Sequence, residues 1–391
     1  MTTPILQFGT SRFLLAHVDL FISEALAAGD GGQALGGITI VQSTGSPASR
    51  TRVQALASGE GYPVRIRGLE DGQVVDRTIR STSIERALGA SEDWPALRDL
   101  FGDAVLKVVV SNTADRGYLL HDGDNASSLL HDAAAPTSFP AKLLVLLHGR
   151  WRRCPSAPLT LLPCELIERN GEVLRDTVAG LAAEWRTEPE FVSWLERHCV
   201  WANSLVDRIV SEAIEPVGAV AEPYALWAVE TQPGLVLPCR HPAIVLTQNL
   251  DLHERLKLFL LNAAHTFLAE RWLADGRPAQ ETVLQAMNDP ALGAELEALW
   301  QDEILPVFAA RGESELALSY LVSVRERFRN PFLAHRLADI AQNHQQKKQR
   351  RLAPIVALAE QVAPGLAQDR LRLALGRIPV SYTHLTLPTK A

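Results

Sequence analysis

Residues 5–41 read ILQFGTSRFLLAHVDLFISEALAAGDGGQALGGITIV, and this stretch decides the fold. Residues 5–8 are a short apolar run, residues 9–11 form a turn, and residues 13–28 carry apolar side chains at helical spacing. A stretch rich in Gly and Asp ends that helix, and residues 37–41 read as a second strand. Strand, helix and strand in this order make one βαβ unit, and short apolar strands are typical of a buried parallel sheet.

Further segments extend the predicted sheet beyond residue 41. Residues 105–110 and 159–162 read as strands, and the first of them leads into the polar cluster Ser111-Asn112-Thr113. Helices are expected at residues 140–147 and 172–185. Residues 64–66 and 74–79 alternate between apolar and polar side chains, which predicts a hairpin inserted in the same sheet.

After about residue 248 the sequence changes character. Five segments have a helical period and none reads as a strand; they are residues 250–272, 282–287, 291–308, 314–328 and 352–362. We therefore predict an N-terminal α/β domain with a Rossmann-like, doubly wound parallel sheet over residues 1–240, followed by an all-α domain over residues 241–378. The basic run at residues 347–351 reads as a solvated helix end. Residues 379–391 have no helical period and are expected to be a non-native tail, which would leave the helical domain truncated.

Composition narrows the class of protein. The 391 residues suggest about two to three domains. With 45 acidic and 38 basic residues the net charge is −7, which argues against a nucleic-acid-binding protein that depends on bulk positive charge. The four cysteines form no CxxC pair, so neither a disulfide framework nor a zinc site is expected. No stretch approaches the roughly 18 apolar residues that span a bilayer, and the first residues lack the pattern of a signal peptide, so we expect a cytoplasmic protein without a membrane partner.

Polar clusters mark the places where a ligand is expected. A doubly wound sheet binds ligands at the carboxyl ends of its strands, and three clusters are assigned to such ends: residues 9–11, 111–113 and 206–208. Gly9 permits a tight turn, and the helix that follows offers N–H groups to a pyrophosphate. Ser11 stands where G-x-G-x-x-G has its second glycine, so an ordinary strand-to-helix turn remains an alternative. No acidic residue clearly ends the second strand, which leaves NADP open beside NAD.

One helix of the second half carries Lys257, Asn262 and His265 in the pattern K-x4-N-x2-H. In a regular α-helix Lys257 and Asn262 lie roughly 140° apart, and Asn262 and His265 roughly 60° apart. A kink or close packing would let all three converge on one ligand, where the lysine suits a general base. The amide and the imidazole suit hydrogen bonding to an oxygen that gathers negative charge. A solvent-facing lysine beside a core histidine is the alternative.

The chain resembles the mannitol dehydrogenase family of long-chain, metal-independent polyol and hexuronate dehydrogenases. The matching pieces extend from Ile5 to about Pro354, and their order and spacing together are specific. They are Gln7–Phe13, Val110–Thr113, Phe139–Lys142, Pro163–Leu166 with Asn170-Gly171, Leu205–Ile209, Glu222-Pro223, Lys257–His265, Ala286–Asp289 and Glu326–Pro331. Leu166 occupies the place of a second polarising asparagine of the polyol dehydrogenases, which favours the hexuronate reductases of the family.

The resemblance implies a role for each matching residue. Lys257, Asn262 and His265 would be the catalytic lysine and the two residues that polarise the substrate oxygen. Arg327 and Asn330 would face the substrate, and no metal is implied. The residues implied to contact the NAD cofactor are Gly9, Ser11, Asn112, Thr113, Val206 and Asp207.

The implied reaction is hydride transfer between a nicotinamide cofactor and a secondary alcohol or ketone of an open-chain sugar acid or polyol. A uronate substrate needs a cationic partner, and Arg327 is the candidate because a guanidinium binds a carboxylate through two hydrogen bonds. A surface salt bridge is the alternative for Arg327, and an ion pair with Arg208 is the alternative for Asp207. A helix histidine with no catalytic part is expected for His253 and His335. A mannitol or fructuronate enzyme of the same family, or a catalytically silent sugar-acid- or nucleotide-binding protein, remains an alternative for the whole chain.

Overall fold

The computed structural model describes residues 2–29, 33–43, 47–113, 117–130 and 133–377, and the chain divides into two compact units. The first unit comprises Met1–Arg67 and Asp76–Leu250, and the second comprises Gly68–Val75 and Asp251–Ala391. The short segment Gly68–Val75 is the tip of a hairpin that groups with the helical unit. The expected tail at residues 379–391 lies outside the described residues.

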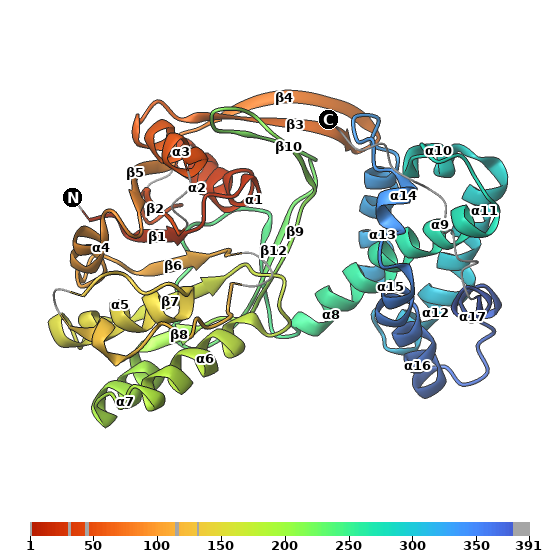
Figure 1. The fold of residues 1–391 in the computed structure, drawn as a ribbon. Helices are drawn as coiled ribbons and strands as arrows, with labels where there is room; N and C mark the ends of the chain where they lie inside the picture. The colour runs from red at the N-terminus through yellow and green to blue at the C-terminus, as the bar shows by residue number, and fades with distance from the viewer. Residues whose placement is uncertain (1, 30–32, 44–46, 114–116, 131–132, 378–391) are drawn as a thin grey trace. The chain divides into compact units, whose positions relative to one another are not determined.

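A six-stranded parallel sheet is the centre of the first unit (Figure 1). Its strands are β1 (Ile5–Phe8), β2 (Ile38–Gln42), β5 (Ile84–Gly89), β6 (Val108–Ser111), β7 (Leu159–Pro163) and β8 (Cys199–Trp201). Their order is β5-β2-β1-β6-β7-β8. Each neighbouring pair is parallel, and β1 pairs with both β2 and β6. This is the doubly wound order, in which the strands are added first to one side of β1 and then, from β6 onward, to the other, so the predicted fold class is confirmed.

The helices of the first unit supply most of its core. They are α1 (Arg12–Leu15), α2 (Val18–Ala27), α3 (Pro47–Ala57), α4 (Trp94–Phe101), α5 (Phe139–Arg153), α6 (Asn170–Glu184) and α7 (Pro189–His198), with a 3₁₀ turn at Ala126–Leu129. Buried apolar side chains of α4, α5, α6 and α7 pack together with those of the strands in one continuous cluster. The valine-rich strand β6 is buried on both faces, which is the pattern expected of a covered parallel sheet.

The predicted helix over residues 13–28 is wrong in one respect, because the chain forms two helices, α1 and α2, with a break at Ala16 and His17. The break leaves main-chain carbonyls that need partners from elsewhere in the unit. The Tyr62 hydroxyl donates to the Leu15 carbonyl at 3.0 Å, and the Arg208 guanidinium donates to the Ala16 carbonyl at 2.6 Å. Long-range hydrogen bonds therefore stabilise a break that helical periodicity could not reveal.

Two smaller sheets complete the first unit, and they correct two predictions. Their strands are β3 (Tyr62–Glu70), β4 (Gln73–Ser81), β9 (Ser204–Asp207), β10 (Val210–Ala213), β11 (Ala219–Ala221), β12 (Leu226–Glu230) and β13 (Ile244–Thr247). The hairpin β3–β4 belongs to a four-stranded sheet β10-β11-β3-β4 and not to the main sheet. The cluster at residues 206–208 ends β9 of a three-stranded sheet, so only two of the three polar clusters follow strands of the main sheet.

The second unit is helical, as predicted, and in the described residues no strand follows β13. Its helices are α8 (Leu250–Arg255), α9 (Ala263–Ala274), α10 (Val283–Asn288), α11 (Pro290–Ala298), α12 (Leu305–Ala310), α13 (Ser314–Phe328), α14 (Leu337–Ile340), α15 (His344–Arg351), α16 (Ala353–Val362) and α17 (Asp369–Gly376). Two π-helical segments, Leu256–Asn262 and Leu299–Ile304, connect α8 to α9 and α11 to α12. The predicted helices at residues 250–272 and 291–308 are thus continuous but irregular.

The basic run at residues 347–351 is not simply a solvated helix end, because Lys348 is fully buried. Its ammonium lies 3.1 Å from Glu270 of α9 and donates to the Arg377 carbonyl at 2.6 Å. His344 lies 2.7 Å from the same Glu270 oxygen. Burial alone would raise the pKa of Glu270, but the hydrogen bonds with His344 and Lys348 outweigh it and hold that pKa below its ordinary value. This cluster fixes α15 against the helix that carries His265.

Candidate active site

The loop after β1 is built for close approach of another group. Gly9 has a φ of +110°, which a residue with a side chain rarely adopts. A Cβ atom on Gly9 would lie 2.5 Å from the Asn112 carbonyl oxygen, so the loops after β1 and β6 meet there without room for a side chain. The Ser11 hydroxyl accepts a hydrogen bond from the Leu14 amide at 3.3 Å and caps α1. Because this cradle lies at the switch point of the sheet, the residues present fit a dinucleotide pyrophosphate.

The loop after β6 is held in place by the segment that follows β7. The Asn112 side-chain amide donates to the Cys164 carbonyl at 2.9 Å. The Thr113 amide and hydroxyl both donate to Glu165, each at 2.9 Å. The segment after β7 is itself tied to β9, because the Asn170 side chain donates to the Pro163 carbonyl at 3.1 Å and to that of Ser204 at 2.9 Å. The pattern pieces around residues 111, 164 and 170, far apart in sequence, therefore meet at one edge of the sheet.

Val206 and Asp207 belong to a different sheet but to the same unit. Both are buried, and Asp207 is 4% exposed. The Arg208 guanidinium donates to the Glu222 carbonyl at 3.0 and 2.8 Å as well as to Ala16, so it joins the three-stranded sheet to the break between α1 and α2. Contact of Val206 and Asp207 with a cofactor stays a prediction.

The predicted catalytic residues lie in and directly after the first π-helical segment. The Ala263 amide donates to the Leu258 carbonyl, five residues earlier, where an α-helix would bond four residues earlier. A turn that closes after five residues places positions five apart, such as Lys257 and Asn262, on the same face. Asn262 and His265 are three positions apart where α9 begins, and such residues are also neighbours on one face. In a regular α-helix the pattern K-x4-N-x2-H would place its lysine and asparagine on different faces. The π-helix is the irregularity that lets the three residues share one face.

Aromatic side chains hold this part of the helix in place. The indole of Trp300, from the second π-helical segment, is fully buried and donates to the Leu260 carbonyl at 3.0 Å. The His265 ring stacks on Phe328 with ring centroids 4.3 Å apart, and Phe328 in turn packs against Trp300 at 5.9 Å. Trp300 was not singled out by any sequence motif. Its role depends on a main-chain carbonyl 40 positions away, which no local pattern encodes.

We expect Trp300→Phe to lower kcat about tenfold and the free energy of unfolding by about 1–3 kcal/mol, because the buried Leu260 carbonyl loses its indole donor. NADH affinity should stay within about twofold of wild type. Trp272→Phe is the matched control, since the Trp272 indole donates to the Pro278 carbonyl at an exposed position. Steady-state kinetics and urea unfolding measure both effects. An unchanged kcat in Trp300→Phe would show that the π-helical geometry does not depend on this bond.

The two predicted substrate residues lie at the end of α13 and just beyond it. Arg327 and Asn330 are each 5% exposed, so the alternative of a surface salt bridge for Arg327 is wrong. The Arg327 guanidinium donates to the Tyr320 hydroxyl at 3.4 Å. The His335 ring lies 4.9 Å from the His265 ring in an edge-to-face arrangement, and burial lowers the pKa of His335. His335 therefore adjoins the predicted site, which the sequence did not indicate.

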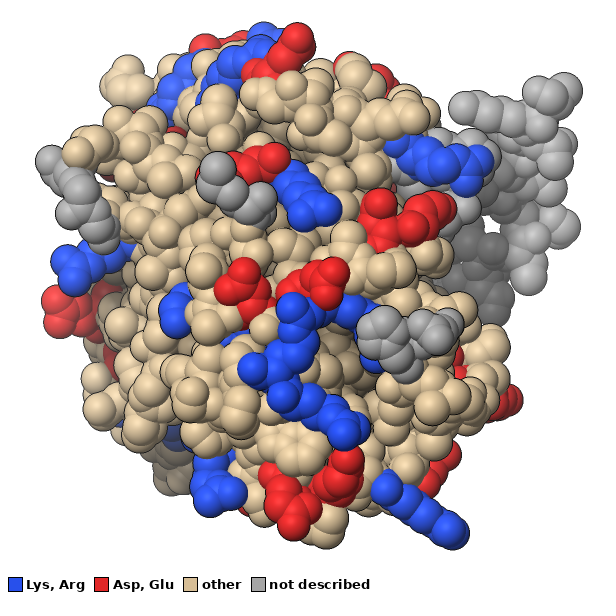
Figure 2. All heavy atoms as spheres, turned by 90° about the vertical axis from the view of Figure 1, so that its left-hand side faces the viewer, with Lys and Arg blue, Asp and Glu red and all other residues tan. Residues whose placement is uncertain are grey.

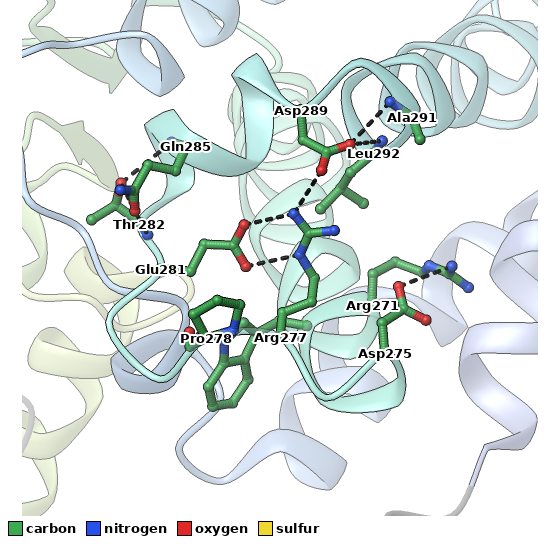
Figure 3. A network of polar contacts seen from close by, with 11 residues as sticks. Arg271, Asp275, Arg277, Pro278, Glu281, Thr282, Gln285, Asp289, Ala291 and Leu292 are labelled. Carbon is green, nitrogen blue, oxygen red and sulfur yellow. Dashed lines mark hydrogen bonds and ion pairs between the residues drawn. The ribbon is translucent and has the colours of Figure 1, made fainter.

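A polar network fixes the loop that leaves α9 (Figure 3). Arg277 binds both carboxylate oxygens of Glu281, at 2.8 and 2.7 Å, and also binds Asp289 at 2.9 Å. The other Asp289 oxygen accepts two main-chain amides at the start of α11, each at 3.0 Å. Thr282 and Gln285 form a capping box at the start of α10. Asp289, the last of the motif residues 286–289, thus connects the start of α11 to Arg277, just beyond the helix that carries His265.

The charged groups of the surface are of both signs. Acidic and basic side chains lie next to one another on the face shown in Figure 2. On the first unit, Arg153 lies 2.8 Å from Asp99, and Arg152 lies 3.7 Å from Glu188. Within the described residues, no three His, Cys, Asp or Glu side chains are grouped so as to hold a metal ion. No described helix combines the length and the apolar character needed to cross a membrane.

Comparison with known proteins gives matches to both parts of the chain. Residues 3–236 match the family described as the mannitol dehydrogenase Rossmann domain, and residues 249–383 match the mannitol dehydrogenase C-terminal domain. The altronate oxidoreductase of Bacillus subtilis (strain 168) is 33% identical, over 97% of this chain and 79% of that protein. The altronate oxidoreductase of Klebsiella pneumoniae (strain 342) is 32% identical over the same shares.

Two solved structures share the fold. A substrate-free D-sorbitol dehydrogenase superposes with a TM-score of 0.77 at 22% identity, covering 92% of this chain and 77% of that one. The Pseudomonas fluorescens mannitol 2-dehydrogenase, in a ternary complex with NAD and D-mannitol, gives a TM-score of 0.69 at 20% identity, covering 96% and 78%. With both of its domains matched in order, this chain belongs to the mannitol dehydrogenase family of oxidoreductases.

Proposed function

We propose that this protein catalyses reversible, NAD-dependent hydride transfer between altronate and tagaturonate, that is, between a secondary alcohol and a ketone of an open-chain sugar acid. The observation that carries the proposal is the π-helical segment, because it aligns Lys257 with Asn262 on the face that His265 continues. The altronate oxidoreductases among the relatives support the choice of a hexuronate. Gly9, Ser11, Asn112, Thr113, Val206 and Asp207 are proposed to hold the dinucleotide, whose nicotinamide ring accepts or supplies the hydride.

The side chains of the helical unit would handle the proton and the oxygen. In the oxidation, neutral Lys257 accepts the hydroxyl proton of the substrate at its Nζ atom, and in the reduction the ammonium returns that proton. Asn262 and His265 donate hydrogen bonds to the substrate oxygen, which carries most negative charge while the proton is being transferred. The stacking of His265 on Phe328 restrains the orientation of the ring, so less ordering is needed when the substrate binds.

Substrate choice within the family would depend on the carboxylate of the sugar acid. Arg327 is proposed to bind it, with Asn330 beside it at the end of the same helix. A buried guanidinium binds a carboxylate more strongly than an exposed one, because less water competes for the pair. Leu166 is 67% exposed and offers no side-chain donor where the polyol dehydrogenases have an asparagine, which also favours an acid over a neutral polyol.

The test is a steady-state panel of tagaturonate, fructuronate, fructose and mannitol, each with NAD(H) and NADP(H). We expect kcat/KM for tagaturonate with NADH to exceed that for the neutral sugars by at least about a hundredfold, because only a uronate offers a carboxylate to the buried Arg327 guanidinium. A preference for fructose or mannitol would overturn the choice of substrate. Failure to bind NADH in a fluorescence titration would overturn the enzymatic assignment and favour a silent sugar-acid-binding protein.

A further inference from the structure

Glu165 is a buried carboxylate at the carboxyl ends of two neighbouring strands. The strands β6 and β7 are parallel, and the Cys164 amide extends their pairing by donating to the Ser111 carbonyl at 2.7 Å. Glu165 follows directly and is 3% exposed. One of its oxygens accepts the amide and the hydroxyl of Thr113, and the other accepts the hydroxyls of Ser111 at 3.0 Å and Tyr118 at 3.1 Å. One carboxylate therefore holds the start of the loop after β6 through four hydrogen bonds.

The charge of Glu165 is stabilised by neutral donors. In the described part of the chain its carboxylate receives bonds from three hydroxyls and one amide, and it forms no ion pair with a lysine, arginine or histidine. The Thr113 amide and the Ser111 and Thr113 hydroxyls donate to the carboxylate, and the Tyr118 hydroxyl shares its one hydrogen between Glu165 and the Asn170 carbonyl at 3.3 Å. A set of donors matches an anion better than a neutral acid. A buried charge without a counter-ion acts over a longer range than an exposed one, because little water screens it.

The position of Glu165 determines which part of the cofactor would experience this charge. A doubly wound dinucleotide fold consists of two halves, and in its first half the end of the second strand meets the adenosine ribose. Here that half is β1, β2 and β5, so the half that contains β6 and β7 takes the nicotinamide nucleotide. The nicotinamide ring is a cation in NAD⁺ and neutral in NADH.

We propose that the Glu165 carboxylate has two roles. It positions the loop at residues 111–113, and its negative charge raises the affinity for NAD⁺ relative to the affinity for NADH. A variant with a neutral side chain at this position would lack the second effect. This inference rests on the proposed function, since it assumes a nicotinamide dinucleotide at this edge of the sheet. Glu165 is a positioning and charge-bearing residue and not a catalytic one. Its negative charge attracts the cationic ring and has no comparable effect on the neutral ring. The equilibrium between bound NADH and bound NAD⁺ during the reaction is therefore shifted toward NAD⁺.

The direct test compares NAD⁺ and NADH affinities in wild type and in Glu165→Gln, with NADH measured by fluorescence titration and NAD⁺ by competition with NADH. We expect the ratio of the NAD⁺ to the NADH dissociation constant to rise about tenfold in Glu165→Gln. Tyr118→Phe is the matched control, because it removes one hydrogen bond to Glu165 and retains the charge. In that variant both dissociation constants should change by the same factor.

The wild-type protein gives a second, independent measurement. Burial raises the pKa of the Glu165 carboxyl, and the hydrogen bonds from Thr113 and Ser111 oppose that shift. As the pH falls through this raised pKa the carboxylate is neutralised, so the relative preference for NAD⁺ should decline, and it should do so at a higher pH than an ordinary glutamate would give. Among the residues that the structure describes, the other titratable groups that face Glu165 are the Tyr118 hydroxyl and the Cys164 thiol. Burial raises the pKa of both, so both keep their protons while Glu165 titrates.

The possible results distinguish a failure of this inference from a failure of the proposed function. If wild type binds neither NAD⁺ nor NADH, the proposed function fails and the inference fails with it. If wild type binds both, but Glu165→Gln changes the two dissociation constants equally or not at all, only the inference is overturned. If Glu165→Gln does not fold, the pH dependence of the wild-type ratio decides, and a constant ratio rejects the role of the charge.

Discussion

Lys257→Ala should lower kcat by at least about a thousandfold, because the substrate oxygen loses the group that accepts its proton in the oxidation and returns it in the reduction. The dissociation constant for NADH should stay within about twofold of wild type, since the proposed dinucleotide contacts lie in the other compact unit. Single-turnover kinetics with NADH and tagaturonate, together with a fluorescence titration, measure the two effects separately. A loss of kcat with intact cofactor binding is what a general base requires and what a purely structural lysine would not produce.

The control for this prediction is Lys347→Ala, which removes a half-buried lysine of the same unit that donates to the Ile340 carbonyl at 2.8 Å. That variant should retain kcat. Asn262→Ala should lower kcat about a hundredfold, because it removes one donor to the substrate oxygen and leaves the base in place. Equal losses of turnover and NADH binding in Lys257→Ala would reject the role assigned to this residue.

Arg150→Met is expected to destabilise the first unit by about 3–5 kcal/mol. Arg150 of α5 is fully buried, and its guanidinium donates to five main-chain carbonyls. These belong to Phe101 (3.0 Å), Asp103 (2.8 Å), Leu106 (3.0 Å), Ala157 (3.4 Å) and Pro158 (3.3 Å). They come from the end of α4 and from the approaches to β6 and β7, so a single side chain ties three elements together. Methionine fills much of the space but leaves these carbonyls without their donor.

Urea unfolding followed by tryptophan fluorescence would measure this loss of stability. The matched control is Arg152→Met on the same helix, whose side chain is 65% exposed and lies 3.7 Å from Glu188. An exposed pair of this kind contributes little, so that variant should lose less than about 1 kcal/mol. Similar stabilities for the two variants would contradict a structural role for the Arg150 guanidinium.

Much of the fold follows from local patterns of sequence. The apolar run of β6 and the short strand β1 pack in one continuous apolar core of the first unit, and the periodic helices of the second unit bury apolar side chains of their own. The hydrophobic period specifies such contacts without specifying which residue makes them. This is why the doubly wound sheet and the helical unit are confirmed, while the strands β10 to β13, which belong to two smaller sheets, were not predicted.

The positions of buried polar groups did not follow from these local patterns. Lys348 reads as part of a solvated basic run, yet it is buried against Glu270 of a distant helix. Residues 206–208 read as the end of a main-sheet strand, yet they end a strand of another sheet. Lys348 is held by the carboxylate of Glu270, and Val206 and Asp207 by antiparallel pairing with β12, so both positions depend on polar contacts with other elements. Sequence periodicity cannot specify an individual hydrogen bond.

The amino-acid sequence alone determined the class of fold and the order of the two domains, since these depend on hydrophobic period. It also offered a set of residues for chemistry, through the spacing of Lys257, Asn262 and His265 and through the resemblance to a known family. Tertiary structure alone decided that the helix bearing Lys257 and Asn262 is π-helical, and that Trp300 bonds to the Leu260 carbonyl there. It also decided that Glu165 accepts the hydrogen bonds that hold the start of the loop after β6. The physical reason is that a buried polar group must find a partner wherever the folded chain provides one, and that partner is a property of the whole structure.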